Sequence, residues 1–112
     1  LFITSYGYNS QAKSNYGKML LETIDAVRTT YPGVDVAVTA QPPKAAGDPD
    51  SLPSFERGLS IRLLAIEQRF HLIDVVNAFR SGSNLISEDK IHPNKAGQVK
   101  WTEEATRVIA GS

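Results

Sequence analysis

The sequence predicts an α/β fold in which helices cover the faces of a parallel sheet. Three short apolar runs alternate along the chain with three segments of helical periodicity. Strand–helix alternation of this kind indicates βαβ units, which are joined by right-handed crossovers. The runs also read as strands buried on both faces, as is typical of parallel sheets.

The predicted strands are residues 1–5 (LFITS), 34–40 (VDVAVTA) and 71–76 (HLIDVV). They are rich in β-branched and other apolar residues, which favour a strand. Three strands make a poor parallel sheet, because the helices have little sheet to cover and an apolar edge stays open. We therefore expect either another chain or segment that completes the sheet, or a chain that is a fragment of a larger domain.

Helical periodicity marks the three remaining segments, in which apolar residues recur at spacings of three and four and so share one helix face. In the first segment these residues are Leu20, Ile24, Val27 and Tyr31, ahead of the helix-stopping Pro32-Gly33. In the second, which begins at Pro53-Ser54, they are Leu59, Leu63, Ile66 and Phe70. The third runs from about Lys95 to Ile109, with Trp101, Ala105 and Val108 on one side.

Composition narrows the classes of function. The 112 residues suffice for one small domain, and 12 basic side chains balance 12 acidic ones. There is no basic stripe for nucleic acid and no apolar run long enough to span a membrane. The chain has no cysteine, and the sequence suggests neither a metal site nor a cofactor. A mini-domain that binds a nucleotide would need a glycine-rich phosphate loop, which is not found.

Three unusual loops each follow a predicted strand: residues 7–13 (GYNSQAK), 41–53 (QPPKAAGDPDSLP) and the segment around SEDKIHPNKAGQ. Ligands of open α/β sheets bind outside the carboxyl ends of the strands, so all three loops fall on the expected functional edge. The second loop is the longest irregular segment. We take its first residues, Gln41, Pro42 and Pro43, as candidates for shaping a substrate pocket.

The third loop places Asp89 three residues before His92. A carboxylate that accepts from one imidazole nitrogen fixes the tautomer and leaves the other nitrogen free to take a proton. Pro93 biases His92 away from helical backbone. The alternative is that Asp89 only closes an Asx-turn and that His92 caps the following helix. As a metal site the pair falls short of the three or four protein ligands that zinc takes.

In the first loop, Gly7 permits a tight turn and Asn9 follows at the carboxyl end of the strand. An amide in this position is able to donate a hydrogen bond to a developing oxyanion. The alternative is an ordinary strand-to-loop turn, in which glycine and asparagine are common.

Taken together, the two motifs resemble those of the SGNH hydrolases, also called GDSL esterases and lipases. Gly7-Tyr8-Asn9 is similar to the third family block, G-x-N-D, with Ser10 in place of the aspartate, and DKIHPNKAG (89–97) matches the fifth, D-x-x-H-P-N-x-x-G. The resemblance implies a flavodoxin-like three-layer α/β/α fold, present here as a partial β-α-β-α-β-α segment. It further implies that Asp89 orients His92, that His92 is the general base, and that Asn9, with Gly7, forms the oxyanion hole.

The resemblance also implies that residues 1–112 are the carboxyl-terminal part of one family domain. The nucleophilic serine of the family lies in a G-D-S block, and no G-D-S occurs in this sequence. We therefore expect the nucleophile to come from upstream or from another chain, and these residues alone to be inactive, since losing a triad serine costs about 10⁶ in kcat in one protease.

Residues 74–101 are further similar to SGNH domains attached to bacteriophage tail and fibre proteins. That likeness implies a virion or extracellular location and an acetylated glycan as the ester substrate. The competing hypothesis is a structural or carbohydrate-binding module that retains the scaffold without the chemistry. An intact or a substituted upstream serine would distinguish the two.

Overall fold

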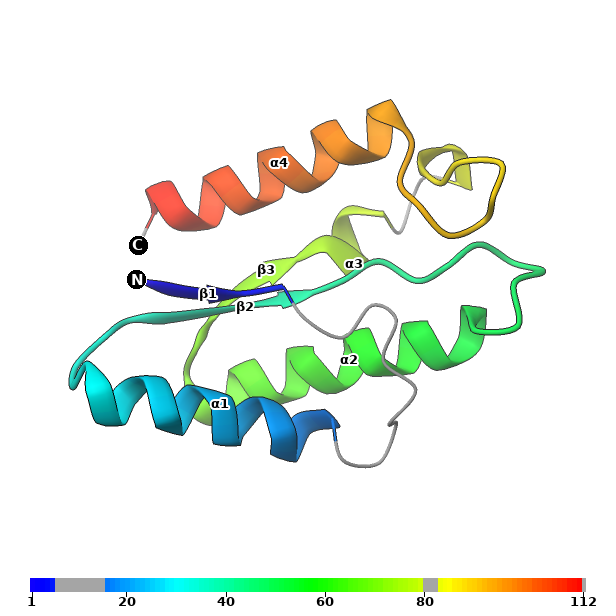
Figure 1. The fold of residues 1–112 in the computed structure, drawn as a ribbon. Coiled ribbons are helices and arrows are strands. Elements are labelled where there is room, and N and C mark those ends of the chain that lie inside the picture. Colours follow the sequence, from blue (N-terminus) through cyan, green and yellow to red (C-terminus); the bar gives the residue numbers. More distant parts are fainter. Residues whose placement is uncertain (6–15, 80–82, 112) are drawn as a thin grey trace.

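A computed structural model describes residues 1–5, 16–79 and 83–111. The elements are β1 (Phe2–Thr4), α1 (Tyr16–Thr30), β2 (Val36–Ala40), α2 (Ser51–Gln68), β3 (His71–Asp74), α3 (Val75–Ala78), the 3-10 turn η1 (Ser83–Leu85) and α4 (Lys95–Ala110). The three strands form one parallel sheet in the order β1-β2-β3. Figure 1 shows α1 and α2 on one face of this sheet and α4 on the other. The predicted α/β fold with a partial three-layer arrangement is confirmed.

The central strand β2 is buried along its whole length. Its register pairs Val36 with Phe2 on one side and Ala37 with His71 on the other. Small and β-branched residues suit this position, because a central parallel strand meets helices on both faces. The side chains of β2 thus alternate between two core clusters, one on each face of the sheet.

The core on the α1 and α2 face includes Leu20 and Ile24, as the helical spacing predicted. Tyr31, the last member of that spacing, lies just beyond α1 and is exposed. On the opposite face, α4 packs its predicted side against the second cluster. Trp101, Ala105 and Val108 contact a group formed by Ala37, Ile73, Val75 and Phe79.

The packed face of α2 differs from the apolar face that the sequence predicted. Leu63 and Ile66 are exposed, and Phe70 is buried beyond the end of the helix. The buried residues of α2 are Ser54, Arg57, Gly58, Ile61, Leu64 and Ala65. Gly58 gives the reason, because a Cβ atom there would lie 2.5 Å from Cγ2 of Val76 and 3.0 Å from the carbonyl oxygen of Gln41. At Gly58 the helix therefore lies too close to α3 and to the end of β2 for a side chain to fit, and this fixes which face of α2 is buried.

The third strand also ends earlier than predicted. Val75 and Val76 belong to the short helix α3 and not to β3. The carboxylate of Asp74 accepts a hydrogen bond from the backbone N–H of Asn77 at 3.0 Å, which caps α3. A side-chain cap of this kind favours helix over continued strand directly after the capping residue.

Candidate active site

The loop between η1 and α4 folds as a narrow hairpin. Ile86 and Pro93 form an isolated antiparallel bridge at its base. The backbone N–H of Ser87 donates to the carbonyl of His92 at 2.7 Å, and that of Asn94 donates to the carbonyl of Leu85 at 2.9 Å. His92 is therefore held in place by its own backbone, on the strand-like arm of the hairpin that leads into α4.

Asp89 lies in the turn of this hairpin. The turn is closed by the N–H of Lys90, which donates to the carbonyl of Ser87 at 2.9 Å. Lys90 itself has the left-handed backbone conformation, with a φ of 66°. The Oδ1 atom of Asp89 accepts from the backbone N–H groups of Ile91 and His92, each at 2.9 Å. One carboxylate oxygen of Asp89 thus fixes the backbone conformation at Ile91 and His92.

The other carboxylate oxygen contacts the imidazole. His92 Nδ1 lies 2.6 Å from Asp89 Oδ2. A carboxylate can only accept, so Nδ1 carries the proton and donates, and Nε2 of the neutral ring is left as an acceptor. The His92 side chain is 71% exposed and that of Asp89 is 46% exposed. The ring is therefore open to a group that approaches Nε2.

The electrostatics agree with this geometry. The hydrogen bond from the His92 side chain, together with those from the backbone N–H groups of His92 and Ile91, lowers the pKa of Asp89 from 3.8 to about 2. Asp89 is consequently ionised at any pH at which the histidine could act as a base. An ionised carboxylate in this position stabilises the imidazolium that forms when Nε2 takes a proton.

Asp89 forms both of the contacts considered for it: Oδ1 closes the Asx-turn and Oδ2 contacts the His92 ring. The helix cap, however, is Asn94 and not His92. Asn94 Oδ1 accepts from the N–H of Gly97 at 2.9 Å. Gly97 lies so close to the hairpin that a Cβ atom there would be 2.2 Å from the carbonyl oxygen of Leu85. Asn94 and Gly97 therefore allow the first turn of α4 to pack closely against the hairpin that carries the Asp–His pair.

The proline-rich loop adjoins this hairpin. The N–H of Ala45 donates to the carbonyl of Lys90 at 2.8 Å. A Cβ atom on Gly47 would lie 2.9 Å from Lys90 Nζ, so the lysine side chain crosses the loop at its glycine. The loops that follow β2 and β3 thus meet at one edge of the sheet, as the sequence predicted.

The three substrate-loop candidates take different positions. Gln41 Nε2 donates to the carbonyl of Ser5 at 2.7 Å and contacts its hydroxyl at 3.1 Å, which links the ends of β2 and β1. Its Oε1 is buried and has no hydrogen-bond partner among the described residues. Pro42 is fully buried, and Pro43 lines an open cleft. The candidate oxyanion-hole residues Gly7 and Asn9 lie outside the described residues.

Sequence reasoning missed a charged cluster in the proline-rich loop. A carboxylate oxygen of Asp50 lies 2.8 Å from Lys44 Nζ and 2.5 Å from Arg57 Nη2. The Arg57 hydrogen bond, aided by Lys44, lowers the pKa of Asp50 to about 2 against an opposing effect of burial. The seven-residue spacing from Asp50 to Arg57 was the available signal, because it spans two helical turns.

The described residues contain no group of three or more histidine, aspartate, glutamate or cysteine side chains that could hold a metal ion. Within the same ranges, none of the helices has the length and apolar character needed to cross a membrane.

Comparison with known proteins adds information about the fold. No protein-family model matches the sequence, and neither does any curated protein sequence. Among solved structures, the chain is similar to the esterase domain of the ORF1 protein from the zebrafish ZfL2-1 retrotransposon, with a TM-score of 0.79 and 19% sequence identity. The match covers 91% of this chain and 61% of that domain.

This neighbour comes from a retrotransposon and not from a phage, so the comparison adds nothing to the phage-tail resemblance. At this level of identity it speaks for the backbone arrangement alone. The described residues therefore have an α/β fold like that of part of an esterase domain, with an Asp–His pair in the loop that follows β3 and α3.

Proposed function

We propose that this chain supplies the general base of a serine ester hydrolase, with Asp89 and His92 as two members of a catalytic triad. The observation that carries the proposal is the contact of 2.6 Å between Asp89 Oδ2 and His92 Nδ1, on a ring whose side chain is 71% exposed. The match to an esterase domain in fold and the D-x-x-H-P-N-x-x-G motif support it.

In the proposed reaction a serine hydroxyl attacks the ester carbonyl while His92 Nε2 takes the hydroxyl proton. Asp89 stabilises the resulting imidazolium. The tetrahedral intermediate collapses, the alcohol leaves with the proton from Nε2, and an acyl-enzyme remains. A water molecule then repeats the sequence: its proton passes to Nε2, and the acid and free serine are released. We assign Asn9 and Gly7 as donors to the oxyanion by their resemblance to the third family block.

We propose that the serine is supplied from outside these residues, because the sequence holds no G-D-S. The sheet offers a place for the segment or chain that carries it. β1 pairs only with β2, so its other edge bears no described strand. Beside it lies an open cleft of about 690 Å³, whose lining includes Ile3 and Met19, both large apolar residues that are exposed. An added strand would satisfy the edge and cover these side chains.

The test is hydrolysis of p-nitrophenyl acetate by the full-length protein and by its His92→Ala variant. Loss of the general base is expected to lower kcat by several orders of magnitude, with about 10⁴ or more as the guide from triad enzymes. His71→Ala replaces the other histidine, which lies in β3, and should retain activity when its folding is confirmed by circular dichroism. Turnover by His92→Ala close to that of the wild type would refute the proposal.

A further inference from the structure

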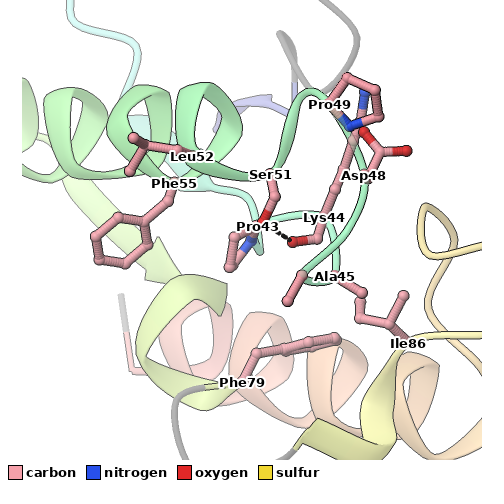
Figure 2. A pocket seen from close by; sticks show the side chains of 11 residues that line it. Pro43, Lys44, Ala45, Asp48, Pro49, Ser51, Leu52, Phe55, Phe79 and Ile86 are labelled. Carbon is pink, nitrogen blue, oxygen red and sulfur yellow. Dashed lines mark hydrogen bonds between the residues drawn. The ribbon is translucent and has the colours of Figure 1, made fainter.

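A large cleft opens beside the Asp–His hairpin. It has a volume of about 830 Å³, within the range of small-molecule sites. Figure 2 shows Leu52 and Phe55 of α2 on one side, Phe79 and Ile86 across from them, and the proline-rich loop between. Leu52 and Phe55 are 65% and 40% exposed, so large apolar surface remains in contact with water here.

The cleft adjoins the hairpin that carries the proposed catalytic pair. Ile86, which lines it, forms the β-bridge with Pro93, the residue directly after His92. Ala45, another lining residue, donates its backbone N–H to the carbonyl of Lys90 in the same hairpin. The hairpin that carries Asp89 and His92 thus also contributes a side chain, Ile86, to the wall of the cleft.

The polar groups of the lining are occupied in holding the loop. The Ser51 hydroxyl donates to the carbonyl of Lys44 at 2.9 Å, shown as the dashed line in Figure 2. Lys44 Nζ is paired with Asp50, and Asp48 Oδ1 accepts from the N–H of Asp50 at 2.8 Å. Recognition of a sugar would require polar groups aimed at its hydroxyls. The surface left for a ligand is mainly apolar.

We propose that this cleft binds the unbranched apolar chain of the ester substrate. The inference rests on the proposed function and specifies its substrate class: esters with a chain of several methylenes, in preference to acetyl esters of a polar glycan. The same lining could take a chain from either side of the ester bond, the acyl side or the alcohol side.

The size of the expected effect follows from apolar transfer. Moving one methylene from water into an apolar lining is worth about a four-fold gain in binding. If even two of four added methylenes are fully covered, kcat/KM should rise by about ten-fold or more from acetate to hexanoate. Esters that remain in water show no such rise.

The experiment measures kcat/KM of the full-length protein for two ester series. In the first, the acyl group of p-nitrophenyl esters grows from acetate to octanoate. In the second, acetate is kept and the alcohol grows from ethyl to octyl. A rise in the first series places the acyl chain in the cleft, and a rise in the second places the alcohol chain there. Flat profiles in both series would overturn the inference while leaving ester hydrolysis itself intact.

A matched pair of variants ties any rise to this cleft. Leu52→Gln is expected to reduce the hexanoate-to-acetate ratio by about three-fold or more, since it removes apolar lining. Leu63→Gln makes the same substitution on the same helix at a leucine that is 62% exposed and does not line the cleft. It should leave the ratio unchanged. Equal effects of both variants would contradict the assignment.

If the protein hydrolyses no ester at all, the proposed function fails and the cleft is tested by binding. Millimolar sodium octanoate should then shift the backbone amide signals of Leu52, Phe55 and Ala45 in nuclear magnetic resonance spectra, and the Leu52→Gln variant should weaken those shifts. The absence of any shift at these residues would overturn the inference independently of catalysis.

Discussion

Asp89 holds His92 at two points with one carboxylate: Oδ1 accepts the backbone N–H of His92 at 2.9 Å, and Oδ2 contacts its ring Nδ1 at 2.6 Å. The same residue therefore fixes where the histidine stands, which way its ring faces and which nitrogen bears the proton. A spacing of three residues suffices for this because the hairpin turn folds the carboxylate back over the chain that follows it.

The orientation of His92 is tested by Asp89→Asn. The amide can still accept the backbone N–H bonds through its oxygen, but it is neutral and does not stabilise an imidazolium. In a serine protease the equivalent change lowers kcat by about 10⁴, and we expect a loss of similar size here, with KM little changed. Ester turnover in the full-length protein measures it. Glu88→Gln removes the neighbouring exposed carboxylate and serves as the control, which should keep its activity.

The pKa of Asp89 gives a second, structural test. Its value of about 2 can be followed by the carboxyl ¹³C resonance in an acid titration. Because the folded-state pKa lies below the usual 3.8, its contribution to stability is fully present above about pH 4 and is lost as the pH falls through about 2. In His92→Ala the midpoint should rise towards 3.8 but stay below it, since the two backbone N–H bonds remain. A wild-type midpoint near 4 would contradict the hydrogen-bonded geometry.

The charged cluster predicts that Asp50→Asn destabilises the fold. The substitution leaves Arg57, only 6% exposed, and Lys44, only 9% exposed, without their carboxylate. We expect the free energy of unfolding to fall by about 2 to 3 kcal/mol at neutral pH, as measured by urea denaturation. The pKa of Asp50 is lowered, so its stabilisation is lost as the pH falls from about 4 through about 2.

The Asp50→Asn variant should therefore lose part of the pH dependence of stability in that range. Glu103→Gln is the control, because its carboxylate lies 3.9 Å from Lys100 Nζ in an exposed pair. A surface pair of this kind contributes at most about 1 kcal/mol. If both variants lost the same free energy of unfolding, the buried cluster would contribute no more to stability than an exposed ion pair.

Because α4 packs closely against the hairpin at Gly97, we expect Gly97→Ala to lower both stability and activity. The added Cβ atom would meet the Leu85 carbonyl oxygen at 2.2 Å and the Pro93 Cβ at 3.0 Å, so the backbone must shift. We expect a loss of about 1 to 3 kcal/mol in the free energy of unfolding, together with reduced ester turnover, because the hairpin that holds His92 moves.

Gly17→Ala provides the comparison for that change. Gly17 also lies in the first turn of a helix, and a Cβ atom there would have no contact within 4 Å among the residues that the structure describes. Alanine has the higher helix propensity, so this variant should be neutral or more stable by up to about 1 kcal/mol. Destabilisation of both variants to the same degree would contradict the packing argument for Gly97.

The fold class and the edge that carries the site were predictable from the sequence. Strand–helix alternation reports on chain topology, and topology brings the loops after β2 and β3 to one edge whatever their side chains are. The Asp–His contact was predictable because both residues come from one short turn. The Asx-turn and the contact with the His92 ring are compatible, because each uses a different oxygen of the Asp89 carboxylate.

The packed face of α2 and the charged cluster were not predictable in the same way. Hydrophobic spacing favours the largest apolar residues, yet the buried face of α2 is set by the close approach of Gly58 to Val76 of α3 and to the carbonyl oxygen of Gln41, which follows β2. The interaction of Asp50 with Lys44 depends on how the proline-rich loop folds back, and the periodicity of apolar residues in the sequence does not predict the path of a loop. Leu52 and Phe55, which line the cleft, belong to no sequence motif that would have marked them in advance.

The most direct measurement of the central claim is the reaction of the full-length protein with diisopropyl fluorophosphate, followed by intact mass. We expect a single covalent adduct on a serine outside residues 1–112, formed as fluoride leaves and His92 Nε2 takes the hydroxyl proton. We further expect His92→Ala to slow this labelling by several orders of magnitude. Absence of an adduct on the folded wild-type protein, or labelling of His92→Ala at the wild-type rate, would contradict the assignment of His92 as the general base.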